Sequence, residues 1–206
     1  MIRTIDKIGG LLEKPEETVT TLLHGAGRFA ESIFIVVLFS ASFSLSVALI
    51  ITRLVSAVLP LFPMPSLVTQ LTHSYAAPAI IGSILMIGLT HDLINFFVGG
   101  LVTHAAARLL GGAGELSQVL LINGYTWVSL TFMLAGCIVA ALNFLAGILV
   151  LVALALLTWV WHIYLFSLGV SESHGISTGK ALLAVLSWDV AKVVVLVAAI
   201  KILEVV

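Results

Sequence analysis

Residues 80–103 read IIGSILMIGLTHDLINFFVGGLVT, an apolar run that is long enough to cross a bilayer as one helix. With about 100° of rotation per residue, its polar and small side chains share about one third of the helix circumference. These residues are Gly88, His91, Asp92, Asn95, Gly99 and Thr103. Because an ionisable group facing hydrocarbon costs at least about 2.5 kcal/mol, we expect this stripe to face other spans of the chain or of a second copy.

The composition indicates an integral membrane protein. Of 206 residues, 61% are hydrophobic and 9% are charged, with a mean hydropathy of +1.23, whereas about a quarter of the residues in a soluble domain are charged. The net charge of −1 provides no strongly basic field, so we expect no nucleic-acid partner. The single cysteine, Cys137, permits no intramolecular disulfide.

Residues 1–28 are too polar for a secretory signal and predict an amphipathic juxtamembrane segment. Its apolar residues recur at helical spacing: Ile2, Ile5, Ile8, Leu11 and Leu12. We expect Gly9-Gly10 to interrupt this pattern and Pro15 to begin a second helix. The segment either rests on the membrane surface without specific recognition or docks a partner.

The remaining residues, 29–206, predict an all-α integral membrane protein, a five-span transmembrane helix bundle in one membrane domain. Four prolines after the first span forbid a long continuous helix there and allow a short one over residues 66–74. The predicted spans are residues 30–52, 79–103, 119–142, 144–168 and 180–203, with a polar segment over 169–179 between the last two.

The distribution of Lys and Arg predicts the orientation. Most basic residues near span ends fall on the amino-terminal side of the membrane: Arg3, Lys7, Lys14, Arg28, Arg108 and Lys180. Arg53 and Lys201 fall on the other side. The positive-inside rule therefore predicts a cytoplasmic amino terminus and an outside carboxy terminus.

Two stretches resemble a known family: THAAARLLGG at 103–112, followed by Tyr125, and LGVSESHGISTGKAL at 168–182. Both are similar to the Yip (Ypt-interacting protein) domain family of five-span membrane proteins, particularly its archaeal and bacterial members. LEKPEET at 12–18 resembles the entry segment of those prokaryotic members. The order and spacing of these stretches cover nearly the whole chain.

The resemblance implies a single bundle with a cytoplasmic amino terminus. Eukaryotic members are associated with Rab-type GTPases, vesicle trafficking and membrane shaping. This chain departs from them because it has no long cytoplasmic amino-terminal region and no proline directly after Tyr125. We therefore expect a multi-pass protein of a prokaryotic cell membrane rather than a trafficking factor.

The charged residues of the last span suggest a polar cluster. Asp189 and Lys192 are three residues apart, so each can neutralise the other on one helix. We expect a buried polar cluster formed by His91, Asp92, Asn95, Asp189 and Lys192. Its role is either to bind an ion, proton or substrate, or to pin the second span to the fifth by interhelical hydrogen bonds.

Two loops are expected to meet on the cytoplasmic side and to form a surface for a soluble partner or a lipid head group. The residues of this predicted loop surface are His104, Arg108, Glu172, His174 and Lys180. We expect His104 and Glu172 to pair, and Ser177 or Thr178 to cap the last span.

No motif predicts catalysis, a metal or a cofactor. The six histidines are scattered and show no metal-ligand spacing. The glycine-rich segment at 111–114 lacks the GK[ST] ending of a phosphate loop, and Ser173-His174 has no third orienting group.

Two functions agree with these features. The first is a non-enzymatic membrane scaffold or adaptor that contacts lipids, other membrane proteins or a second copy. The alternative is a small transporter or channel whose path passes Asp92 and Lys192.

Overall fold

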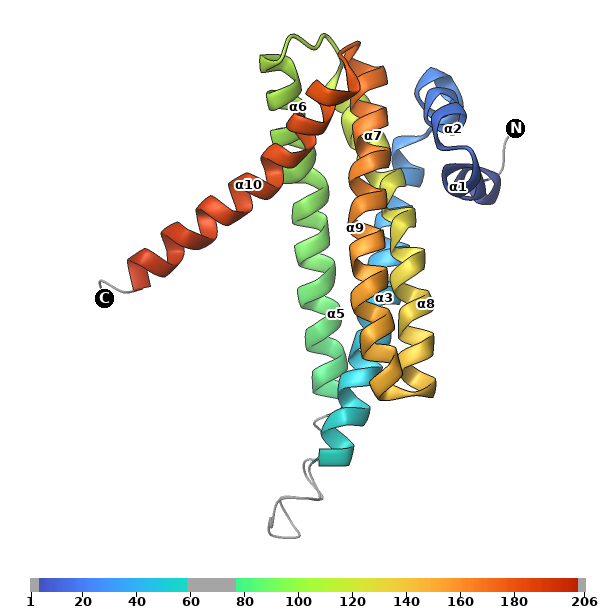
Figure 1. The fold of residues 1–206 in the computed structure, drawn as a ribbon, viewed down its shortest axis with the longest axis vertical. Coiled ribbons are helices and arrows are strands. Elements are labelled where there is room, and N and C mark those ends of the chain that lie inside the picture. Colours follow the sequence, from blue (N-terminus) through green and yellow to red (C-terminus); the bar gives the residue numbers. More distant parts are fainter. Residues whose placement is uncertain (1–3, 59–76, 204–206) are drawn as a thin grey trace. The chain divides into compact units, whose positions relative to one another are not determined.

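A computed structural model describes residues 4–58 and 77–203, and within these residues it contains helices and no strand (Figure 1). The amino-terminal elements are α1 (Thr4–Glu13), α2 (Pro15–Thr21) and the turn η1 (Leu22–Ala26). The remaining elements are α3 (Phe29–Val58), α5 (Ala77–Ile94), η4 (Asn95–Gly99), α6 (Gly100–Leu109), α7 (Leu116–Thr126), η5 (Trp127–Ser129), α8 (Leu130–Leu142), α9 (Phe144–His174) and α10 (Thr178–Leu203).

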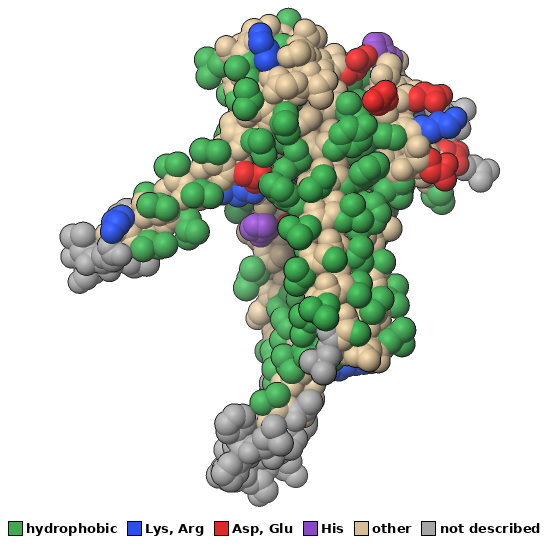
Figure 2. Space-filling model, viewed as in Figure 1, with side chains coloured by type: hydrophobic (Ala, Val, Ile, Leu, Met, Phe, Trp, Pro, Cys, Tyr) green, Lys and Arg blue, Asp and Glu red, His purple; other side chains and the backbone are tan. Residues whose placement is uncertain are grey.

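Five helical stretches are long and apolar enough to cross a membrane, which confirms the predicted all-helical multi-pass protein. They are Phe29–Ser56, Pro78–Leu109, Leu116–Leu142, Ala146–His174 and Thr178–Lys201. Hydrophobic side chains cover the visible face of α9 along its length (Figure 2). Exposed apolar side chains on a helix of this length suit contact with lipid.

The chain divides into two compact units. The first unit comprises Met1–Ile35, Ile94–Val128 and Val160–Val206, and the second comprises Val36–Leu93 and Ser129–Trp159. In the first unit, α6 lies beside the first half of α10 and also packs against α7 (Figure 1). This packing positions most of the residues singled out in the sequence.

The amino-terminal segment differs from the expectation in two ways. Helix α1 continues through Gly9 and Gly10, and the break falls at Lys14, before Pro15 begins α2 as predicted. Gly10 permits α1 to lie against α2, because a Cβ atom there would stand 2.5 Å from Thr18 Oγ1. The helix buries Lys7 and Leu11 while Ile5 is 78% exposed, so its buried face includes Leu11 of the predicted apolar stripe but not Ile5.

The fourth predicted span also ends later than expected. Helix α9 continues past residue 168 to His174, and most of the predicted polar segment is helical. Gly175, with φ of +64°, then turns the chain toward α10 in a left-handed conformation that favours glycine. The short helix predicted at residues 66–74 lies outside the described residues.

Candidate functional site

The second long span, Pro78–Leu109, contains one π-helical turn, η4. This turn lies in the part of the span that belongs to the first unit. At η4 the Phe96 carbonyl accepts the backbone N–H of Gly100, and Asn123 of α7 also donates its Nδ2–H to that oxygen at 2.8 Å. Asn95 accepts a hydrogen bond on Oδ1 from Trp188 Nε1 of α10, at 2.9 Å. The turn therefore joins α7 and α10 through side-chain hydrogen bonds, and such turns are common at functional sites.

The charged pair of α10 begins one residue after Trp188. Asp189 Oδ1 and Lys192 Nζ are 2.6 Å apart, and the ammonium lies 5.5 Å from the Trp188 ring centroid. The two side chains are 34% and 43% exposed. The pair thus neutralises itself on one helix, at the spacing noted in the sequence.

His162 of α9 is a polar residue that the sequence interpretation left outside the cluster. Its ring stands edge-on to Trp127 at 6.1 Å and contacts Phe166, and it hydrogen bonds to the Thr126 backbone. The charges of Asp189 and Lys192 interact electrostatically with the His162 ring. In the sequence it lies among Trp159, Trp161 and Tyr164, and only the helix packing reveals the neighbouring charges.

His91 and Asp92 belong to the second unit, where they pair with each other on α5. The His91 Nδ1 atom lies 2.9 Å from Asp92 Oδ1, and the two side chains are 69% and 13% exposed. The structure thus places one hydrogen-bonded pair on α5 and one ion pair on α10. The predicted grouping of His91 and Asp92 with Lys192 stays a prediction.

The predicted loop surface lies entirely in the first unit, where the connection from α6 to α7 docks on the end of α9. His174, only 3% exposed, accepts the Gly114 N–H on Nδ1 at 3.2 Å, so its proton resides on Nε2. That Nε2–H points to His104 Nδ1 at 3.3 Å. The His174 carbonyl also accepts the Ala113 N–H at 3.1 Å.

The pairing expected between His104 and Glu172 is wrong, because His104 faces His174 instead. Continuation of α9 through residue 174 directs Glu172 outward, and its side chain is exposed. Lys180 Nζ donates to the Leu110 carbonyl at 3.0 Å and ties α10 to the end of α6. Arg108 is exposed on α6. His104, His174 and Lys180 thus hold α6, the α6–α7 connection, the end of α9 and the start of α10 together, and we call this contact the joint. Arg108 and Glu172 remain accessible.

A further charge pair of the first unit, in which the lysine is buried, was not predicted. Lys7 Nζ of α1 lies 2.5 Å from Glu31 Oε2 of α3, and Tyr125 of α7 donates its hydroxyl to the same carboxylate at 2.6 Å. Lys7 is only 5% exposed. The available signal was the spacing of Lys7 and Leu11, four residues apart on one helix face, which the predicted isoleucine stripe obscured.

The Yip1 domain family model matches residues 9–200, nearly the full length of the chain. The chain belongs to the Yip1 domain family. Comparison with curated proteins and with solved structures found no significant match. Both stretches that carried the resemblance fall within the matched residues of this Yip1 domain, and the two stretches contact each other through His104 and His174.

The described residues contain no group of three or more His, Cys, Asp or Glu side chains that could hold a metal ion.

Proposed function

We propose that this Yip1 domain protein is a non-enzymatic membrane scaffold or adaptor of a prokaryotic cell membrane. In this proposal the amino terminus is cytoplasmic, the carboxy terminus is outside, and the loop surface binds a protein partner or a lipid head group. The observation that carries the proposal is the joint of His104 and His174, which holds Arg108 and Glu172 exposed on rigid helices. Charged side chains held in this way suit recognition more than chemistry.

The polar groups inside the spans support the same function. Asp189 and Lys192, Trp188 and Asn95, and Asn123 and the Phe96 carbonyl form pairs within the chain. Paired groups of this kind fix helices against one another at about 1 kcal/mol each. We propose that the polar cluster, including His91 and Asp92, has this structural role.

Affinity purification from native membranes in mild detergent, with proteins and lipids identified, tests the adaptor function. We expect Arg108→Ala and Glu172→Ala to lose co-purifying partners at least fivefold while thermal stability is unchanged. Lys14→Ala, another exposed charge outside this surface, is the matched control and should retain them. Equal capture by all three variants would contradict a role for the surface.

A liposome flux assay distinguishes the transporter from the scaffold. The scaffold function predicts no ion- or pH-dependent flux in wild type or in Asp92→Asn. Flux in wild type that Asp92→Asn abolishes would overturn the proposal in favour of transport.

A further inference from the structure

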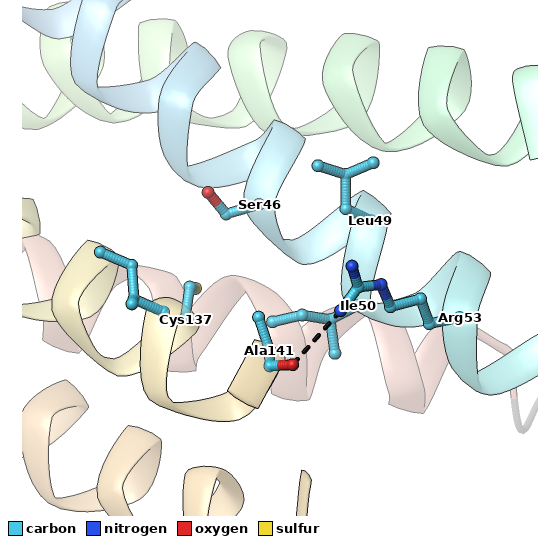
Figure 3. A pocket seen from close by; sticks show the side chains of 7 residues that line it. Ser46, Leu49, Ile50, Arg53, Cys137 and Ala141 are labelled. Atoms are coloured by element: carbon cyan, nitrogen blue, oxygen red, sulfur yellow. Dashed lines mark hydrogen bonds between the residues drawn. The ribbon is translucent and has the colours of Figure 1, made fainter. Parts of the chain in front are cut away.

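A groove lies between α3 and α8 in the second unit (Figure 3). Its lining is mostly apolar and includes one cation, Arg53. Its volume is about 170 Å³, and its lining comprises Ser46, Leu49, Ile50, Arg53, Cys137, Ile138 and Ala141. A second hollow of about 410 Å³ shares Ile50, Arg53 and Ala141 and continues along Leu54, Leu142 and Phe144. Arg53 therefore stands where the two hollows meet.

Most of this lining is apolar, and the hydroxyl group it contains is already bonded. Ser46 donates its hydroxyl to the Ser42 carbonyl at 2.8 Å. Arg53 donates one guanidinium N–H to the Ala141 carbonyl at 3.2 Å, drawn in Figure 3. Arg53 forms no ion pair with any residue in the described ranges 4–58 and 77–203. A guanidinium carries several N–H donors, so its charge and most of its donors remain available.

The turn between α8 and α9 fixes the depth of the guanidinium in the membrane. Helix α8 ends at Leu142, and Asn143 begins the next helix by accepting the Ala146 N–H on Oδ1 at 3.2 Å. A turn between two spans must lie where water can reach its backbone. Because Arg53 binds the carbonyl of Ala141, next to this turn, its charge lies at the depth of the lipid head groups.

The groove extends from this depth into the hydrocarbon. Ser46 precedes Arg53 by about two helical turns on α3, which corresponds to roughly 10 Å along the helix axis. Leu49 and Ile138 are 50% and 64% exposed along this length. The groove thus presents an apolar wall below a single cation.

We propose that this groove binds one anionic phospholipid, with its phosphate on Arg53 and an acyl chain along Leu49, Ile50 and Ile138. A planar guanidinium pairs well with phosphate oxygens, and an acyl chain suits an apolar wall inside a bilayer. Charge complementarity favours a lipid over an apolar helix, which would leave the Arg53 charge without a counter-ion. The site lies apart from the loop surface and does not depend on the adaptor function.

Native mass spectrometry of the full chain, released from mixed micelles of phosphatidylglycerol and phosphatidylcholine, tests the site. Wild type should retain one phosphatidylglycerol in preference to phosphatidylcholine. Arg53→Gln should reduce phosphatidylglycerol retention at least fivefold, and Arg53→Lys should restore part of it. Ile138→Trp, which fills the groove, should reduce retention of both lipids.

Two matched controls distinguish loss of this lipid site from the general effect of removing a cation or adding an indole. Lys14→Gln removes an exposed cation outside both proposed binding surfaces, and Leu149→Trp adds an indole to an exposed position on α9, so both should retain lipid as wild type does. The proposal is overturned if Arg53→Gln retains as much phosphatidylglycerol as wild type. It is also overturned if Lys14→Gln loses as much as Arg53→Gln does, or if a second protein chain rather than a lipid is retained.

A measurement on wild type alone keeps the test independent of variant folding. Cys137 is the single cysteine of the chain and lies in the groove wall. Phosphatidylglycerol should slow its alkylation by a small maleimide at least threefold relative to the delipidated protein. An unchanged alkylation rate would contradict occupancy of the groove.

Discussion

Lys7 of α1 and Glu31 of α3 form an ion pair of 2.5 Å, and the lysine side chain is almost completely buried. The Tyr125 hydroxyl donates to the same carboxylate, so the pair connects the amino-terminal helix with two of the apolar stretches. This contact explains why α1 turns a lysine inward while Ile5 remains exposed. Helix α1 is therefore attached to α3 and α7 by a specific contact.

Lys7→Met should release this helix. The substitution removes the Lys7 ammonium and leaves Glu31 with the Tyr125 hydroxyl and the nearby charge of Arg28, and losing a hydrogen bond between charged groups costs about 1.5–3 kcal/mol. We expect a lower melting temperature in detergent and faster protease cleavage within residues 4–21. Lys14→Met is the control, because its pair with Glu17 is exposed and should change stability by less than about 0.5 kcal/mol. Equal effects of both variants would contradict the attachment.

His174→Ala should loosen the joint where residues 110–114, between α6 and α7, contact the end of α9. The substitution removes the acceptor for the Gly114 N–H and the partner of His104. An unsatisfied buried donor costs about 1–3 kcal/mol, so we expect a lower melting temperature and faster amide exchange over residues 110–114. Glu172→Ala, two residues earlier and exposed, should leave both measurements unchanged. Unaltered exchange in His174→Ala would show that the histidine does not hold the turn.

Gly112→Ala should destabilise the same joint for steric reasons. An added Cβ would stand 2.5 Å from His174 Nδ1 and 2.9 Å from the Ala107 carbonyl oxygen. We expect a loss of about 1–3 kcal/mol, as for overpacking of a tight core. Gly179→Ala should instead increase the free energy of unfolding, because nothing lies within 4 Å of its added methyl and alanine favours a helix. Stabilisation by both substitutions would contradict the close approach at Gly112.

Asn123→Leu should disturb the π-helical turn. It removes the donor to the Phe96 carbonyl while nearly keeping the side-chain volume. The Phe96 carbonyl keeps its backbone bond from Gly100 but loses the amide donor, and we expect a cost of about 0.5–1.5 kcal/mol and faster amide exchange over residues 95–100. Asn123→Gln, which retains an amide, should recover part of the stability. If Asn123→Leu is as stable as wild type, the hydrogen bond does not maintain the turn.

The sequence predicted the features that depend on hydrophobicity and local spacing. Apolar length was sufficient to predict helices that can cross a membrane, and the i, i+3 spacing was sufficient to place Asp189 beside Lys192. The contacts of Lys7, His162 and Trp188 depend on which helix faces meet in three dimensions. The hydrogen bond from Asn123 of α7 to the Phe96 carbonyl likewise joins two helices, so the periodicity of residues 80–103 alone could not reveal it.

The pair of Asp189 and Lys192 offers the sharpest test of how a charge is tolerated within a span. Lys192→Met leaves an unpaired carboxylate and Asp189→Asn leaves an unpaired ammonium, each costly at membrane depth. The double variant carries no charge, so it should be more stable than either single variant, with a coupling of about 0.5–3 kcal/mol in a double-mutant cycle. Melting temperatures in lipid nanodiscs and the yield of membrane-inserted protein measure this coupling. Additive losses would mean that each charge is stabilised by groups other than its partner, and the self-neutralised pair would then no longer explain how this helix resides in the membrane.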